Sequence, residues 1–141
     1  AKQLNSFYMR CLRKLLHIKW QDKTSVTEVL QRAEMTSVYT RLRRSQLRWA
    51  GHVCCIPDEC IPKRLFYGEL AEGKHSRGGQ KKRFKDTLKA YMKSCVIDPD
   101  SWEQLAKDRA AWSHQINSSA AAFEEHQINE AKHKCQQRKS R

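Results

Sequence analysis

Apolar residues recur at intervals of three and four along two long stretches of the chain. From Gln3 to Ile18 they form one stripe, made of Leu4, Phe7, Cys11, Leu12, Leu15 and Ile18. From about Ser37 to Val53 a second stripe contains Val38, Leu42, Trp49 and Val53 and is widened by Leu47 and Ala50. This spacing is typical of amphipathic helices. Both stretches are therefore predicted to be helices that bury one face.

Capping signals and prolines divide the remaining chain. Ser25 with Glu28 predicts the start of a short helix. Asp98-Pro99 predicts another, which carries Trp102, Leu105, Ala106, Arg109 and Trp112. Pro57 and Pro62 bracket a connector, because proline lacks an amide donor. For the stretch that follows, 65–70, the pattern fits a short strand or a frayed helix equally well.

A polar, Gly-rich loop lies near the middle of the chain, from Gly73 to Gln80. It is followed by a predicted basic helix from about Lys81 to Cys95, whose buried side consists of Phe84, Leu88, Tyr91 or Met92, and Cys95. After Asn117 a polar helix leads to a basic tail. We therefore predict an all-α fold: a small irregular bundle of about five or six helices with a basic loop and an extended C-terminal helix. The predicted domains are 1–116, which binds nucleic acid, and 117–141, a basic helix or tail.

The charge balance of the chain indicates what kind of partner it binds. The chain has 28 Lys and Arg against 15 Asp and Glu, a formal net charge of +13. Solubility alone requires far less, so the excess indicates a polyanionic partner, with nucleic acid as the first candidate. The segment 1–20 contains bases and no acid, whereas 96–131 is mainly acidic. Such segregation favours a phosphate-facing surface.

Two groups of basic residues are the candidate phosphate contacts. Arg41, Arg44 and Arg48 step by three and four along a predicted helix, so they are expected to form one ridge or an ordinary exposed face. The second group follows the Gly-rich loop into the next helix and consists of Lys74, Arg77, Lys81, Lys82, Arg83 and Lys85. Glycines allow backbone amides to approach an anion, although a solvated connector is the alternative. Contacts with phosphates, not base edges, are expected.

The six cysteines match no disulfide scaffold and are interpreted as reduced thiols. His52 with Cys54, Cys55 and Cys60 suggests a zinc site, but adjacent cysteines chelate one tetrahedral ion poorly. The favoured interpretation is that His52 caps or hydrogen-bonds near a helix end after Gly51 and that the thiols are buried or incidental, so no metal or cofactor is predicted. Trp49, Trp102 and Trp112 are interpreted as core residues in preference to base-stacking ones. No stretch is apolar enough for a membrane span, and membranes are not among the predicted partners.

The order of motifs resembles a known family. The motifs are Leu47-Arg48-Trp49-Ala50-Gly51-His52-Val53, then Ile61-Pro62-Lys63, the loop from Gly73 to Phe84, and Asp108-Arg109 with Trp112. Together they resemble the segment that follows the polymerase domain in non-LTR retrotransposon polyproteins, which join an endonuclease to a reverse transcriptase. One departure is Gly78-Gly79-Gln80, where the family usually continues Gly-Arg-Pro. The chain starts at Ala1 in helix-like sequence, so we expect it to be part of a longer protein.

The resemblance implies a role without catalysis in this segment. The family's polymerase uses paired aspartates that hold two metal ions, and its endonuclease uses a separate carboxylate and histidine set; neither arrangement occurs in this sequence. The expected partners are the RNA or DNA phosphate backbone and the upstream reverse transcriptase domain. The expected location is a nuclear and cytoplasmic ribonucleoprotein. The alternatives are a helical scaffold that packs on the polymerase, and a truncated or domesticated fragment that acts in protein interaction.

Overall fold

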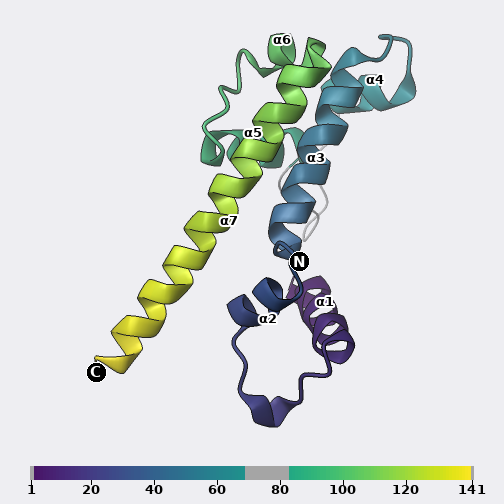
Figure 1. Cartoon of the computed structure of the whole chain (residues 1–141). Helices are drawn as coiled ribbons and strands as arrows, with labels where there is room; N and C mark the ends of the chain where they lie inside the picture. Colours follow the sequence, from purple (N-terminus) through teal and green to yellow (C-terminus); the bar gives the residue numbers. More distant parts are fainter. Residues whose placement is uncertain (1, 69–82, 141) are drawn as a thin grey trace, which may run out of the picture. The chain divides into compact units, whose positions relative to one another are not determined.

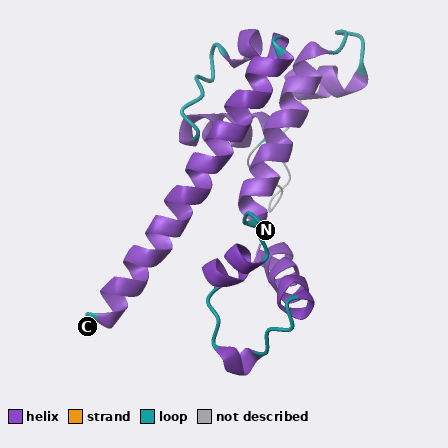
Figure 2. Cartoon of the chain, viewed as in Figure 1, coloured by secondary structure: helices purple, strands orange, loops and turns teal. Residues whose placement is uncertain are grey.

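The computed structural model describes residues 2–68 and 83–140, and within these ranges it is helical, without strands (Figure 2). The prediction of an all-α fold is therefore confirmed. The α-helices, labelled in Figure 1, are α1 (Lys2–Leu15), α2 (Val26–Arg32), α3 (Val38–Cys55), α4 (Ile61–Tyr67), α5 (Phe84–Ser94), α6 (Trp102–Lys107) and α7 (Arg109–Lys139). A 3-10 helix, η1 (Trp20–Asp22), lies between α1 and α2 in the sequence.

In the stretch that the sequence left open, 65–70, residues 65–67 are helical and Gly68 has an extended backbone that ends the helix. Leu65 and Tyr67 lie in the last turn of α4, which begins after the N-cap Cys60 and carries Pro62 in its first turn. Proline is tolerated there because the first amides of a helix have no partner within it. Residues 69 and 70 lie outside the described residues.

The chain folds into two compact units. The first contains residues 1–43 and 120–141, and the second contains 44–119. Helices α3 and α7 contribute to both. The predicted division into 1–116 and 117–141 stays a prediction, although α7 runs without interruption through Asn117.

The second unit has the larger core. Buried side chains from α3, α5, α6, α7 and α4 meet in one cluster: Leu47, Ala50, Val53, Phe66, Leu88, Met92, Cys95, Ile97, Trp102, Ala106, Trp112 and Ile116. The ring of Trp102 lies between two others, with its centroid 6.4 Å from that of Phe66 and 5.8 Å from that of Trp112. Trp102 and Trp112 are therefore core residues, as predicted.

The tightest approach in this core is between α3 and α7 at Gly51. A Cβ atom on Gly51 would lie 2.1 Å from Nε1 of Trp112, so the indole occupies the space of a side chain. Trp112 is 5% exposed, and its buried Nε1 has no hydrogen-bond partner among the described residues. Only glycine fits at position 51 with this packing.

The first unit has a smaller core between α1 and α2. Met9, Leu12, Val29 and Leu30 are buried, and Tyr8, Leu16, Ile18, Ala33 and Met35 pack against them. The predicted buried stripe of α1 is wrong in part: Leu4, Phe7 and Leu15 are 44%, 64% and 75% exposed. Helix α1 thus has a second apolar face that the described residues leave uncovered.

The start of α3 is held by a carboxylate from α7, again within the first unit. Glu124 accepts hydrogen bonds from the backbone N–H of Ser37 at 3.0 Å and from its hydroxyl at 2.8 Å. The buried hydroxyl of Thr40 donates to the same carboxylate. A helix N-terminus favours negative charge, so Glu124 satisfies both the free amide and the helix dipole.

The predicted helix from Asp98 to Trp112 is divided in two. Asp98 accepts hydrogen bonds from the hydroxyl of Ser101 and the amide of Asp100 in the turn before α6. Asp108 then ends α6 and starts α7, because its Oδ1 accepts from the amides of Ala110 and Ala111 at 2.9 and 3.1 Å. The Asp108 cap therefore interrupts the apolar periodicity that predicted one helix.

Three helices end in the same way although glycine is absent from their ends. In α5 the amide of Ile97 donates to the carbonyl of Met92 and that of Val96 to Lys93, a Schellman arrangement. Helices α1 and α2 end equivalently at His17 and Glu34. The residue at the turn has a positive φ in each, 54° at His17, 52° at Glu34 and 55° at Val96. A β-branched residue is strained most in this conformation.

Replacing Val96 with glycine is expected to stabilise the protein by about 1 kcal/mol, because glycine adopts positive φ without a steric penalty. Val96 is 91% exposed, so little packing is lost. The urea midpoint should rise with an unchanged slope. The matched control is Val96→Ala, which retains Cβ and should gain clearly less. A Val96→Gly variant no more stable than Val96→Ala would contradict the strain argument.

Candidate nucleic-acid interface

The predicted arginine ridge lies on α3, and its members are exposed. Arg44 and Arg48 belong to the second unit and are one turn apart, whereas Arg41 belongs to the first. Within the described residues the guanidinium groups of these three arginines have no hydrogen bond or ion pair. That they act together on one phosphate chain stays a prediction.

Arg48 lines a cleft of about 240 Å³ together with His52 and Arg109. The other lining residues are Gly51, Cys55, Ala106, Trp112, Ser113 and Ile116. We call this the basic cleft, because Arg48, His52 and Arg109 line it and none of its described lining residues carries a carboxylate. Arg109 is the first residue of α7, where the helix dipole already provides partial positive charge. A cation at this position does not stabilise the helix, but it adds to the attraction for an anion.

Sequence reasoning missed the role of Arg109 in this cleft. The sequence placed it only on the predicted helix after Asp98-Pro99, whereas in the structure it is exposed and forms no ion pair within the ranges that the structure describes. His52 was expected to cap or hydrogen-bond near a helix end, and this is wrong: its side chain is exposed and forms no hydrogen bond within the described residues. Only the tertiary position of α7 reveals both residues as neighbours of Arg48.

The second predicted group is described only in part. Arg83 precedes α5, and its amide donates to Asp86 at 3.2 Å while its Nε lies 3.6 Å from the same carboxylate. The Nζ atom of Lys85 lies 5.3 Å from the centre of the Tyr67 ring. Lys74, Arg77, Lys81 and Lys82, and with them the Gly-rich loop, lie outside the described residues.

Arg83 and Lys85 border a groove of about 580 Å³ in the second unit. We call it the aromatic groove. Its remaining lining consists of Trp49, Phe66, Tyr67 and Phe84 with Ile61, Pro62, Leu65 and Gly68. The lining therefore combines aromatic faces with two cations, and no described residue in it is acidic. Such a combination is typical of surfaces that bind single-stranded nucleic acid.

Two aromatic residues of this groove were predicted to be buried, and that prediction is wrong. Trp49 is 43% exposed and Phe84 is 39% exposed, with ring centroids 5.1 Å apart in an edge-to-face arrangement. Phe66, 6.0 Å from both rings, connects the pair to the core. Leu47 and Ala50, not Trp49, are the buried residues of α3 at this level, because α7 covers a different face.

The first unit has a basic surface of its own. A cleft of about 630 Å³ is lined by Arg10, Arg13 and Lys14 with Asn5, Ser6, Met9, Ile18 and Val26. Helix α1 contains no acidic residue. The sequence did not indicate that these three bases share a cleft.

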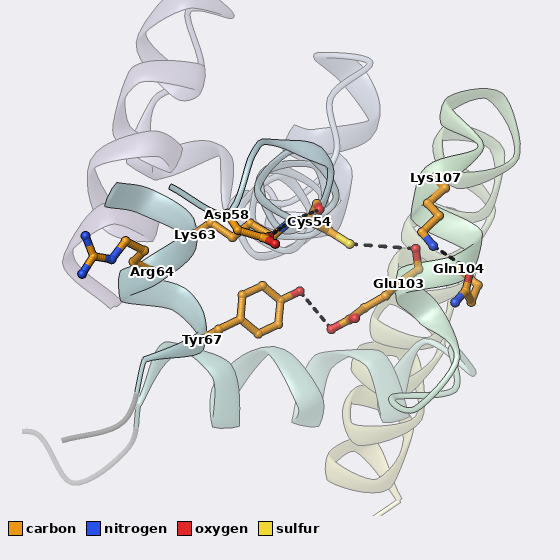
Figure 3. Close-up of a pocket in the computed structure, with 8 residues that line it drawn as sticks. All are labelled: Cys54, Asp58, Lys63, Arg64, Tyr67, Glu103, Gln104 and Lys107. Atoms are coloured by element: carbon orange, nitrogen blue, oxygen red, sulfur yellow. Dashed lines mark hydrogen bonds and ion pairs between the residues drawn. The ribbon is translucent and has the colours of Figure 1, made fainter. Parts of the chain in front are cut away.

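A polar pocket of about 530 Å³ lies elsewhere in the second unit and has a different character (Figure 3). The Tyr67 hydroxyl donates to Glu103 at 2.9 Å. Lys63 donates to the carbonyls of Cys54 and Ile56, at the end of α3, and forms an ion pair with Asp58 at 2.8 Å. These bonds tie the turn after α3 to α4 and α4 to α6, which is a structural role.

In the polar pocket the pKa shifts of Cys54 and Lys63 oppose their activation as a nucleophile or base. Burial raises the pKa of the Cys54 thiol, and the thiol donates to the carbonyl of Glu103 at 3.9 Å. The hydrogen bond to Asp58 raises the pKa of Lys63, which keeps the ammonium charged. Burial, reinforced by the bond to Glu103, raises the pKa of Tyr67 far above its usual range. A nucleophile or base at neutral pH requires the opposite shifts in cysteine and lysine.

The cysteines are free thiols, as predicted. Cys55 donates to the carbonyl of Ala106 at 3.3 Å, so this thiol makes contact with α6. In residues 2–68 and 83–140 no group of three or more His, Cys, Asp or Glu side chains is arranged to hold a metal ion. In the same ranges no helix is long and apolar enough to cross a bilayer.

Comparison with protein-family models, with curated proteins and with solved structures finds no match to this chain.

Changing Tyr67 to Phe should make stability less sensitive to alkaline pH. The raised pKa of Tyr67 means that its contribution is fully present below about pH 10, its unfolded value, and is lost as the pH rises further. Urea unfolding should therefore show that Tyr67→Phe is about 1 kcal/mol less stable at neutral pH and declines less steeply above pH 10 than the wild type.

The matched control is Tyr39→Phe, at an exposed tyrosine outside the polar pocket. It should follow the wild-type curve above about pH 10. If Tyr67→Phe loses stability as steeply as the wild type in that range, the protonated Tyr67–Glu103 bond is not the source of the alkaline sensitivity.

Proposed function

We propose that this chain is a nucleic-acid-binding module without catalytic activity of its own, which holds RNA or DNA through phosphates. The observation that carries the proposal is the basic cleft of Arg48, His52 and Arg109, in which the described lining contains no carboxylate. The net charge of +13 supports it, because the charge greatly exceeds what solubility needs.

The arrangement of ion pairs distinguishes two kinds of basic residue. Arg32, Lys63 and Lys134 pair with Glu28, Asp58 and Glu130 at 2.6, 2.8 and 2.5 Å. By contrast, Arg44, Arg48 and Arg109 are exposed and have no such partner among the described residues. A cation without a carboxylate partner can bind a phosphate without first breaking an ion pair within the protein, and its binding releases counterions from the nucleic acid.

The resemblance to non-LTR retrotransposon polyproteins suggests the larger protein in which such a module acts. We propose that the chain is the segment following the polymerase in a non-LTR retrotransposon reverse transcriptase, and that it delivers template RNA or target DNA to the upstream polymerase domain. Polymerase and endonuclease chemistry then belong to other parts of that protein. In this role the chain would act within a ribonucleoprotein in the nucleus and cytoplasm.

A scaffold function is the second candidate, and one observation favours it. On α1, Leu4, Phe7, Cys11 and Leu15 follow one another at intervals of three, four and four, and the leucines and Phe7 are exposed. Such a stripe fits an apolar groove on another domain. In this alternative the segment packs against the polymerase, or acts in protein interaction as a truncated or domesticated fragment.

The test is the salt dependence of binding by a variant of the basic cleft. The variant Arg48→Gln with Arg109→Gln should reduce the slope of log Kd against log salt by roughly 0.9 units per lost duplex contact, or roughly 1.8 in total. Fluorescence anisotropy of a labelled DNA duplex at several salt concentrations measures the slope.

The control is Arg32→Gln with Lys134→Gln, which removes the same charge from residues that already have carboxylate partners. It should leave the slope nearly unchanged. An equal loss of slope in both double variants would mean that only total charge matters. If the wild type does not bind nucleic acid in a salt-sensitive way, the proposal fails and the scaffold function gains support.

A further inference from the structure

We infer that the aromatic groove receives unpaired bases, so that the module prefers single-stranded to duplex nucleic acid. The inference rests on the proposed function and assigns a substrate class to it. The proposed function requires only phosphate contacts, which single and double strands both offer. The aromatic groove adds a surface that can distinguish them.

The groove exposes more apolar surface than a highly charged protein needs. Ile61 and Leu65 on α4 are 69% and 76% exposed, and Trp49 and Phe84 contribute large aromatic surfaces beside them. A contiguous exposed apolar surface of this kind usually marks a binding site. Trp49 is also held in place, because its edge-to-face contacts with Phe84 and Phe66 fix the ring without covering it.

The charges at the groove decide in favour of nucleic acid over an apolar protein surface. Arg83 and Lys85 border it; Arg83 also forms an ion pair with Asp86 at 3.6 Å, but none of the described residues that line the groove carries a carboxylate. An apolar protein partner has no need of two cations, whereas a base stacked on an aromatic ring brings its phosphate to the edge of the site. The combination of ring faces with neighbouring cations thus matches a base and its phosphate.

The preference for single strands follows from whether the faces of the bases are accessible. In a duplex the faces of the bases are covered by their neighbours, and only edges and phosphates are accessible. Stacking on Trp49 or Phe84 therefore requires a base that has left the stack, as in single strands, loops and ends. Binding in the groove is expected to tolerate different bases, since every base has a π face.

The test compares Trp49→Leu with Trp20→Leu. Both remove one partly or fully exposed indole, 43% and 85% exposed, but only Trp49 lines the groove. Anisotropy titrations at one salt concentration would use labelled oligouridine and a labelled DNA duplex. Trp49→Leu should weaken oligouridine binding roughly 5- to 150-fold, the usual effect of losing one stacked base, and leave duplex binding nearly unchanged. Trp20→Leu should change neither.

Two further measurements keep the inference open to refutation if Trp49→Leu does not fold. Phe84→Leu, at the first residue of α5, should also weaken oligouridine binding selectively. The wild type itself should prefer oligouridine to the duplex when compared per phosphate.

The possible failures can be told apart. Salt-sensitive binding to both forms, without a preference and without an effect of Trp49→Leu or Phe84→Leu, would overturn this inference and leave the proposed function standing; the groove would then suit a protein partner. No salt-sensitive binding of either form would overturn both.

Discussion

The close approach of Trp112 to Gly51 determines how the second unit presents its surface. Because the indole occupies the place of a side chain at position 51, α7 lies against the backbone of α3. This contact turns Leu47, Ala50 and Val53 into the core. Arg48 and Trp49 consequently remain on exposed faces of the same helix. The packing that builds the core therefore also determines which residues of α3 are left exposed.

Electrostatics divide the basic residues of the chain by what they contribute. Lys63 neutralises Asp58 and satisfies two carbonyls at the end of α3, so its charge serves the fold. Arg109 is different, since it stands at the positive end of α7 and faces the basic cleft with Arg48. The fold gains nothing from cations placed this way. Both guanidinium groups and the positive end of α7 would attract an anion bound in the cleft, which is the physical basis of the proposed function.

Sequence patterns predicted the helices well wherever a local signal exists. Ser25 caps α2 by accepting from the amide of Glu28, as the spacing of the two residues indicated. The helix ends at His17, Glu34 and Val96 could not be predicted, because glycine, the usual sequence signal of such an end, is absent from them. The exposure of Trp49 could not be predicted either, because periodicity places Trp49 close to Leu47 and Ala50, and only the position of α7 decides between them. For the same reason the neighbours of Arg48 in the basic cleft were missed.

The central claim is that nucleic acid binds to the basic cleft and the aromatic groove of the second unit. Amide chemical-shift mapping of the labelled protein with oligouridine tests it directly. The largest changes are expected around Arg48 and Trp49, around Arg83 to Lys85, and at Arg109. Changes spread evenly over all basic residues, or confined to the C-terminal half of α7, would contradict it.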